Sequence, residues 1–180
     1  MVLRPEPIIT TLEACRESRG GAAFHSVLLS PQGEVYDQPK AMALSRMKMP
    51  LALICGRFEG FDERIRAFVD EEISLGDFVL MGGEVAAMAV IESVSRLIPG
   101  VIGNQNSLNN ESFSQHLLEC PHYTKPLNYR GMRVPDVLRS GHHGEIENWR
   151  RKNAISRTKT KRPDLYKRFV ASGGEPSTES

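Results

Sequence analysis

Two patterns of apolar residues alternate along the first hundred positions of the chain. Helical periodicity predicts four helices, at residues 5–19, 40–47, 62–69 and 85–97. Apolar runs predict buried strands, at residues 24–30 and 51–55, with a third short strand around Phe78, before a pair of glycines. Because strands alternate with helices, the sequence predicts an α/β fold with a parallel sheet whose ligands bind at the C-terminal ends of the strands.

The pattern changes after residue 100. The segment VIGNQNSLNN is polar, rich in Asn and without period, so we expect a flexible linker over residues 101–112. Residues 113–170 predict a second, small and mostly helical domain, with basic helices near residues 145–155 and 163–170. The composition of ASGGEPSTES is typical of a disordered tail over residues 171–180. The first domain accordingly comprises residues 1–100.

The distribution of charge is more informative than its sum, which is +1. Residues 59–84 contain eight acidic and two basic residues, whereas residues 139–168 contain ten basic and three acidic ones. A basic C-terminal third is typical of a protein that binds a polyanion such as nucleic acid. A charged helix that only faces solvent would have the same composition.

Cysteine content and hydropathy indicate the compartment. The chain has 180 residues, 40% of them hydrophobic, which is enough for a core of its own. Its three cysteines, Cys15, Cys55 and Cys120, are an odd number without metal-ligand spacing, which indicates reduced thiols packed as small apolar groups. No apolar run has the length of a membrane span, and no leader opens the chain. We therefore expect a cytoplasmic protein with no membrane partner and no dedicated metal site.

Loops rich in small residues follow the predicted strands, at residues 30–33, 56–60 and 82–83. We expect SPQGE, after the first strand, and the acidic start of DEEIS, before the third, to be turns. The pair Gly82-Gly83 lacks the Gly-x-Gly-x-x-Gly pattern of a dinucleotide site, and Glu84 puts an acid where a phosphate would sit. The glycines therefore indicate a ligand that the backbone approaches closely without a phosphate cradle.

Several unusual motifs occur together in one order, namely LSPQG, ICGRFEGFDERI, DEEISLGDFVLMGGE, RLIPGVIGN, ESF, CPHYTKP, VPDVLRSGHH and KRPDL. In order and context they resemble the bacterial tRNA (guanine-N(1)-)-methyltransferases of the SPOUT superfamily, from residue 1 to about residue 169. The resemblance implies a deep trefoil knot in the sheet domain, an exception to the rule that chains avoid knots. It also implies S-adenosylmethionine as methyl donor, and N1 of the guanosine 3′ of the tRNA anticodon as acceptor.

The resemblance further implies a set of donor-binding residues, in which glycines let the main chain approach the adenine. These residues are Ser30, Pro31, Gly56, Ser74, Leu75, Gly76, Phe78, Leu80, Gly82 and Gly83. For any one of these glycines alone, simple turn geometry would be the more ordinary explanation.

The chemistry requires a base and a cation, because N1 of guanine carries a proton at neutral pH and charge gathers on O6 when it leaves. The resemblance places the general base at Glu111, where family members carry the shorter Asp, and the cation at Arg96. An arginine near a helix C-terminus is otherwise usually a partner of the helix dipole.

Substrate contacts are implied at Glu59, Ser112, His122, Lys125 and Arg150. The acid in GRFEG aligns with a family acid near the substrate or a Mg²⁺ ion, although a solvated loop acid would fit as well. The lysine stands where arginine is frequent, and a phosphate accepts either. The implied partners are the tRNA anticodon stem-loop and a second copy of the chain, because the resemblance puts donor pocket and general base on different subunits.

Family members begin with a strand, a helix and an Asp- and Gly-rich segment that lead into the phrase at which this chain starts, MVLRPEP. We therefore expect that a first strand and its loop are missing here, which makes donor binding more secure than turnover. Two alternatives remain open: a truncated, inactive fragment that binds donor or RNA, and another SPOUT RNA methyltransferase. A ribose methyltransferase would need neither Glu111 nor the linker.

Overall fold

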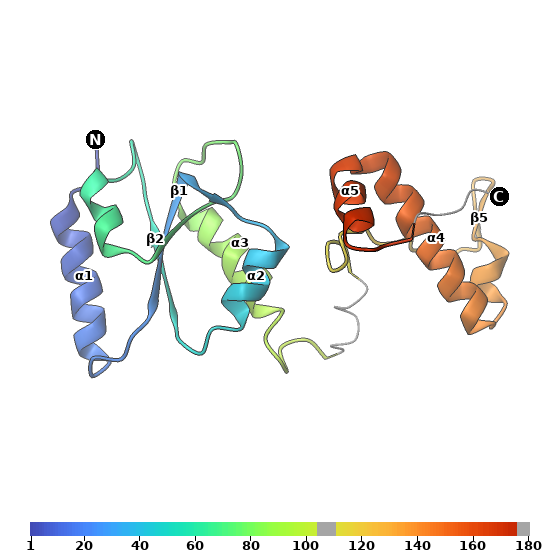
Figure 1. The fold of residues 1–180 in the computed structure, drawn as a ribbon, viewed down its shortest axis with the longest axis horizontal. Helices are drawn as coiled ribbons and strands as arrows, with labels where there is room; N and C mark the ends of the chain where they lie inside the picture. The colour runs from blue at the N-terminus through green and yellow to red at the C-terminus, as the bar shows by residue number, and fades with distance from the viewer. Residues whose placement is uncertain (104–110, 176–180) are drawn as a thin grey trace. The chain divides into compact units, whose positions relative to one another are not determined.

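The computed structural model describes residues 1–103 and 111–175 (Figure 1). The chain divides into two compact units, Met1–Gly103 and Asn104–Ser180, and each is described by itself. The boundary between these units lies three residues beyond the end expected for the first domain, residue 100. Most of the expected linker, residues 104–110, and the last five residues of the expected tail lie outside the described residues.

The first unit is built on a parallel sheet of three strands, β1 (His25–Val35), β2 (Leu51–Cys55) and β3 (Glu71–Ser74). The strand order is β2-β1-β3, and both neighbours of β1 run parallel to it. The α/β class and the parallel sheet predicted from the sequence are therefore confirmed.

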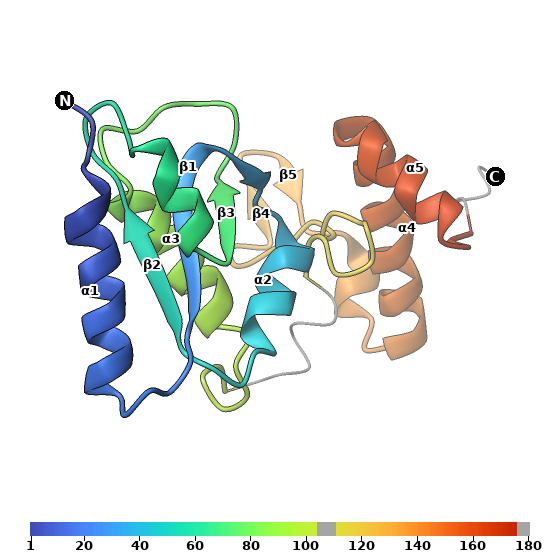
Figure 2. The same ribbon diagram turned by 60° about the vertical axis from the view of Figure 1, so that its left-hand side comes forward.

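Helices cover both faces of this sheet. Figure 1 and Figure 2 show α1 (Pro5–Ser18) and the 3₁₀ helix η1 (Glu63–Phe68) on one side, and α2 (Gln38–Ser45) and α3 (Glu84–Ser95) on the other. All four lie where helical periodicity predicts them, within a few residues, although the second begins two residues earlier and the third is shorter than expected. The segment η1 forms a 3₁₀ rather than an α-helix.

Local caps explain where these helices begin. The side chain of Asp37 accepts a hydrogen bond from the backbone N–H of Lys40, 3.0 Å away, at the start of α2. Asp62 accepts one from the backbone N–H of Arg64 at the start of η1, also at 3.0 Å. Pro5 is the first residue of α1, where its missing N–H costs nothing.

The core of the first unit lies between the sheet and the helices α2 and α3. Alternate residues of β1 point to opposite faces, so Val27 and Leu29 join this cluster while the buried Leu28 points the other way. The cluster also contains Ile73 of β3 and Val90 of α3, both essentially inaccessible to solvent. Burying such side chains is the main force that fixes the helices on the sheet.

The third strand is not where the sequence analysis put it. Residues 78–81 form no strand, and β3 instead occupies Glu71–Ser74, which begins in the expected acidic turn. The two acids are tolerated in a strand because each has a basic partner: Lys40 lies 3.0 Å from Glu71, and Arg66 lies 2.9 Å from Glu72. These partners come from other elements, so a local pattern of residues cannot reveal them.

The turn expected at SPQGE is also wrong in detail. Strand β1 continues to Val35, and its pairing with β3 shifts register between Leu29 and Glu34. The residues between them bulge out of the ladder. The bulge brings Ser30, Pro31 and Gln32 to the edge of a pocket at the C-terminal ends of the strands.

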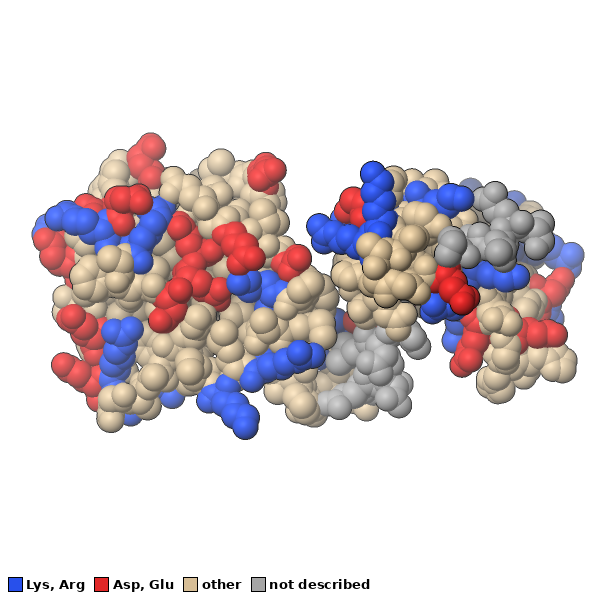
Figure 3. Space-filling model, viewed as in Figure 1, with Lys and Arg blue, Asp and Glu red and all other residues tan. Residues whose placement is uncertain are grey.

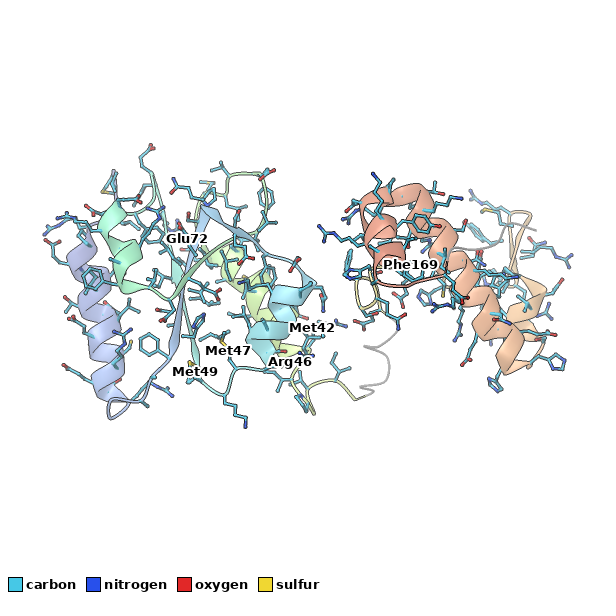
Figure 4. All side chains as sticks on the ribbon, in the orientation of Figure 1. Met42, Arg46, Met47, Met49, Glu72 and Phe169 are labelled. Atoms are coloured by element: carbon cyan, nitrogen blue, oxygen red, sulfur yellow. The ribbon has the colours of Figure 1, made fainter. Side chains whose placement is uncertain are left out.

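Helices are the main regular structure in the described part of the second unit: α4 (His143–Lys161), α5 (Pro163–Ala171) and a short 3₁₀ helix η3 (Asp136–Arg139). A small antiparallel hairpin that the sequence analysis missed joins β4 (Asn128–Tyr129) to β5 (Met132–Arg133). The core consists of Leu117, Ile155 and Phe169, the last of which is labelled in Figure 4. The fully buried hydroxyl of Thr158 accepts a hydrogen bond from the backbone N–H of Leu118.

Candidate functional site

A pocket of about 320 Å³ opens at the C-terminal ends of the three parallel strands, where ligands bind in open α/β sheets. All ten residues that the resemblance implies for donor binding line it. Ser30 and Pro31 lie in the β1 bulge, and Gly56 follows β2. Ser74 is the last residue of β3, and Leu75 and Gly76 follow it. The other four lie in the loop before α3, at Phe78, Leu80, Gly82 and Gly83.

The loop before α3 is fixed to the exit of β2 by its backbone. The N–H of Gly83 donates to the carbonyl of Gly56 at 2.8 Å, and Gly82 forms an isolated antiparallel bridge with Arg57. A Cβ atom at Gly83 would lie 2.8 Å from Cα of Cys55, closer than such atoms approach in proteins. Close packing therefore requires glycine at this position, independently of any ligand.

The acid after the glycine pair has a local partner. Glu84 is the first residue of α3, and its carboxylate accepts a hydrogen bond from Nε of Arg57 at 2.9 Å. The residue's own backbone N–H and the Arg57 guanidinium hold the pKa of Glu84 below its ordinary value. The N-terminus of α3 is thus already occupied by a negative charge of the protein, which agrees with the absence of a phosphate-binding motif.

Two exposed aromatic rings stand in the pocket wall. Phe78 was expected there, whereas Phe58 was not, and both are more than half exposed. Phe58 has a φ of 61°, a left-handed conformation that is uncommon for residues other than glycine and that clusters at functional sites. Its position between Gly56 and Gly60, in a loop after a buried strand, is the signal by which the sequence could have indicated it.

Polar residues that the sequence analysis missed also line the pocket, notably Gln32, Arg57, Glu63 and Arg66. The expected substrate residue Glu59 lies among them on the loop after β2 and is exposed. Its backbone N–H donates to the carbonyl of Met1 at 3.1 Å. The first residues of the chain therefore hold this loop.

The two residues implied for the chemistry lie in different units, so the structure describes each in its own surroundings. Arg96 is half-buried at the C-terminal end of α3, and its backbone N–H donates to the carbonyl of Glu92 at 3.2 Å. Glu111 is half-buried at the start of the described part of the second unit, and the Ser114 hydroxyl donates to its carbonyl at 2.8 Å.

The other implied substrate residues belong to the second unit. Ser112 accepts a hydrogen bond from the backbone N–H of Glu119 at 3.0 Å, and His122 lies 2.9 Å from the carboxylate of the same Glu119. Lys125 and Arg150 are exposed. Figure 3 shows Lys and Arg side chains over the helices α4 and α5, as expected for the basic third of the chain.

The cysteines are free, but Cys15 is exposed, so the expectation that all three pack as apolar groups is wrong for it. Among residues 1–103 and 111–175 there is no group of three or more His, Cys, Asp or Glu side chains that could hold a metal ion. The expectation of Mg²⁺ near Glu59 thus has no ligand set in this part of the chain. Among the same residues, no helix is long and apolar enough to cross a membrane.

Comparison with known proteins gives the family. A relative from Desulfitobacterium hafniense, named tRNA (guanine-N(1)-)-methyltransferase, is 54% identical over 175 residues, which are 97% of this chain and 66% of that protein. Relatives of the same name from Ralstonia nicotianae and Sorangium cellulosum are 52% and 56% identical, over 92% and 99% of this chain and 63% and 75% of the relatives. The chain thus spans about two thirds of the length of the first two relatives. A family model described as tRNA (Guanine-1)-methyltransferase TrmD matches residues 1–168, and the chain belongs to this family.

Proposed function

We propose that the protein transfers a methyl group from S-adenosylmethionine to N1 of the guanosine 3′ of the anticodon in tRNA. The observation that carries the proposal is the pocket, because in a chain of this family all ten implied donor residues surround one cavity at the ends of three parallel strands. That position is the usual ligand site of an open α/β sheet.

The residues of the pocket suit this donor. S-Adenosylmethionine has an adenine, a sugar without phosphate and a charged amino acid end, and the pocket offers glycine backbone, exposed rings and charged side chains for these parts. Phe58 and Phe78 present ring faces, and Gly56, Gly82 and Gly83 leave the backbone accessible. When bound, the donor supplies an electrophilic methyl group.

The chain's own residues would then handle the proton and the charge of the guanine. We assign Glu111 as the general base that accepts the N1 proton, and Arg96 as the cation that stabilises the negative charge on O6. Glu111 is only half-buried, and further loss of water around it on tRNA binding would raise its basicity. Its side chain is one methylene longer than Asp, so the carboxylate must fold back to reach N1.

We propose that the second unit binds the anticodon stem-loop of the tRNA. Its helices α4 and α5 carry Lys and Arg side chains on the face seen in Figure 3, and phosphates of the RNA backbone are the natural partners of such a surface. Lys125 and Arg150 are exposed and therefore available for phosphate contacts. A tRNA substrate also agrees with cytoplasmic location.

We further propose that the protein acts as a homodimer. Three apolar side chains of α3, Val85, Met88 and Ile91, are 60%, 68% and 55% exposed, which is unusual for a helix otherwise packed on a sheet. A symmetric pair would bury this surface and bring Glu111 of one subunit to the donor pocket of the other. Light scattering should give a dimer at micromolar concentration and a folded monomer for Met88→Lys. A monomeric parent chain would contradict the proposal.

We also propose that the first unit contains the deep trefoil knot that the resemblance implies. The loop at residues 78–83 is pinned against the exit of β2 through Gly83, Gly56 and Arg57, which is the kind of contact that would keep a threaded segment in place. Family membership supports the same topology.

The central experiment is methyl transfer under single-turnover conditions. The chain is mixed with methyl-labelled S-adenosylmethionine and with two tRNA transcripts, one carrying guanosine 3′ of the anticodon and one carrying adenosine there. We expect N1-methylguanosine at that position of the first transcript and no label in the second. Label on a ribose, or elsewhere in the RNA, would identify another SPOUT methyltransferase. Donor binding without transfer would identify a binding fragment, and no donor binding at all would overturn the proposal.

A further inference from the structure

An ion pair between Arg66, which lines the pocket, and Glu72, which does not, lies beside one wall of the pocket. Arg66 of η1 donates two hydrogen bonds to the carboxylate of Glu72 of β3, from Nε to Oε2 at 2.9 Å and from Nη2 to Oε1 at 3.0 Å. The side chains of Arg66 and Glu72 are only 25% and 18% exposed. Figure 4 labels Glu72, which lies on the side of the sheet that η1 covers. This paired, partly desolvated geometry is the strong form of the Arg–carboxylate interaction.

Both members of the pair also hold the wall formed by Ser30, Pro31 and Gln32. The Ser30 side chain lies close to the carboxylate of Glu72 and helps to lower the pKa of that group. Nη2 of Arg66 also donates to the amide oxygen of Gln32. Within the wall, the backbone N–H of Gln32 donates to the Ser30 hydroxyl at 3.0 Å. The wall is therefore bonded to the ion pair at Gln32 and lies beside its carboxylate at Ser30, on the other side of Pro31.

The base of the wall is fixed by close packing. A Cβ atom at Gly33 would lie 2.5 Å from the backbone carbon of Glu72 and 2.5 Å from the backbone nitrogen of Ile73. The chain therefore lies directly on β3 at this point. With the base held there, the contacts at Ser30 and Gln32 hold the rest of the bulge beside the pocket.

The charge of Glu72 is maintained despite its burial. Burial alone would raise the pKa of Glu72, but hydrogen bonds from Arg66 and Ser30 outweigh it and lower the pKa. Arg66 has a further carboxylate beside it, because Nη1 donates to Glu63. The network thus contains one guanidinium, two carboxylates and two neutral side chains that face the pocket.

We propose that Arg66 and Glu72 are positioning residues, which hold the wall of Ser30, Pro31 and Gln32 in the shape that binds the methyl donor. The inference rests on the proposed donor site, because it assigns a purpose to the ion pair beside that site. Arginine is required rather than lysine, since only its planar fork reaches Glu72 and Gln32 at the same time.

A control residue lies two positions away on the same helix. Arg64, also on η1, makes the same two-armed contact with Asp62, from Nε at 2.8 Å and from Nη2 at 2.8 Å. Neither Arg64 nor Asp62 lines the pocket. Arg66 itself lines the pocket, whereas Glu72 does not. Arg64→Met therefore controls for the loss of a paired arginine, and Glu72→Gln separates the wall's support from a direct contact of Arg66 with the donor.

The first measurement is donor affinity by calorimetry, with S-adenosylmethionine as the titrant. We expect Arg66→Met to weaken the affinity by about tenfold or more, as lost hydrogen bonds to charged groups usually do, and Arg64→Met to leave it within about twofold. Arg66→Lys should bring the melting temperature back near that of the parent but should not restore donor affinity. A merely structural ion pair would instead let affinity and stability recover together. If Arg66→Met does not fold, Arg66→Lys and Glu72→Gln carry the test.

The second measurement needs no donor. Amide hydrogen exchange at Gln32 and Gly33 should be faster in Arg66→Met than in the parent and in Arg64→Met, because the wall has lost one attachment. If the parent itself does not bind S-adenosylmethionine, the proposed donor site fails, and the support of the wall is judged by exchange alone. Equal exchange at these two amides in Arg66→Met and Arg64→Met would overturn the inference, as would equal donor affinity of the two variants.

Discussion

Gly83 lies against the last residue of β2, so that a Cβ atom at Gly83 would be 2.8 Å from Cα of Cys55 and 3.0 Å from the backbone nitrogen of Gly56. Both neighbours are backbone atoms, which cannot rotate away. Gly83→Ala should therefore lower the free energy of unfolding by about 1–3 kcal/mol, the usual cost of overpacking. Urea denaturation of the chain measures this. Gly103→Ala is the control, because among the described residues, its chain neighbours aside, no atom lies within 4 Å of the added methyl group. Equal stability of the two variants would contradict the packing argument.

Gly82 should respond differently from its neighbour. A Cβ atom there would clash with Oε2 of Glu84, but this is the far end of a flexible and exposed side chain, which can move. Gly82→Val should therefore keep the fold and lose measurable S-adenosylmethionine binding, because the backbone can no longer approach the adenine. Calorimetry and thermal unfolding together test both parts. Unchanged donor affinity would reject the place of Gly82 in the donor site.

The two glycines also indicate what the sequence can and cannot predict. The resemblance implied that both bind the donor, but only packing distances distinguish them. At Gly83 the fold itself requires glycine, whereas at Gly82 the clashing side chain can move away. Such distances depend on which strand lies behind the loop. That information is absent from any local run of residues.

The same reason explains the errors in the fold. The helices and the first two strands follow from local apolar patterns, whereas β3 was missed because Glu71 and Glu72 suggested a turn. Their basic partners, Lys40 and Arg66, come from α2 and η1. The support of the pocket wall by Arg66 was unpredictable for the same reason, since it joins Gln32 to residues more than thirty positions away.

Acid should weaken the first unit in part through Asp70. Its carboxylate accepts hydrogen bonds from the hydroxyl and the backbone N–H of the fully buried Ser26, at 2.5 and 2.7 Å, and these bonds lower the pKa of Asp70. Because the pKa of Asp70 is lower in the folded than in the unfolded chain, where it is about 3.9, ionised Asp70 stabilises the fold above that pH. This stabilisation is lost as the pH falls through the pKa of the folded state. Asp70→Asn should therefore flatten the loss of stability below about pH 4.

At neutral pH, Asp70→Asn should cost about 1 kcal/mol or less, because the side chain is 47% exposed and solvent screens its charge. Thermal unfolding between pH 2 and pH 7 gives both results. Asp77→Asn removes the same charge from an exposed loop and serves as the control. If stability falls equally steeply below about pH 4 in the parent and in Asp70→Asn, Ser26 does not stabilise the ionised carboxylate of Asp70.

Phosphate contacts should be visible in the salt dependence of tRNA binding. Lys125→Ala and Arg150→Ala each remove one exposed cation from the second unit, so each should weaken tRNA affinity and reduce the salt slope by about 1. Lys48→Ala removes an exposed cation from the first unit and should change neither quantity. Filter binding between 50 and 200 mM salt suffices. Unaltered slopes for Lys125→Ala and Arg150→Ala would remove these two residues from the RNA surface.

The proposed base and cation should act on the chemical step alone. Glu111→Gln keeps the size of the side chain and removes its basicity, so methyl transfer should fall by about 10²–10⁴-fold, the usual loss for a missing general base. Arg96→Ala should give a comparable loss, because the charge on O6 develops only as the N1 proton leaves. Donor affinity and tRNA affinity should stay close to those of the parent in both variants.

Single-turnover rates at saturating donor and tRNA separate this chemical role from a binding role. Glu111→Asp is the informative partner variant, because it restores a carboxylate on a side chain one methylene shorter. If Glu111 acts as the base, Glu111→Asp should recover most of the rate that Glu111→Gln has lost, and the recovery should come without any change in tRNA affinity. A rate for Glu111→Gln within a few fold of the parent would assign the proton transfer to another group, and the place of Arg96 would then have to be judged from Arg96→Ala alone.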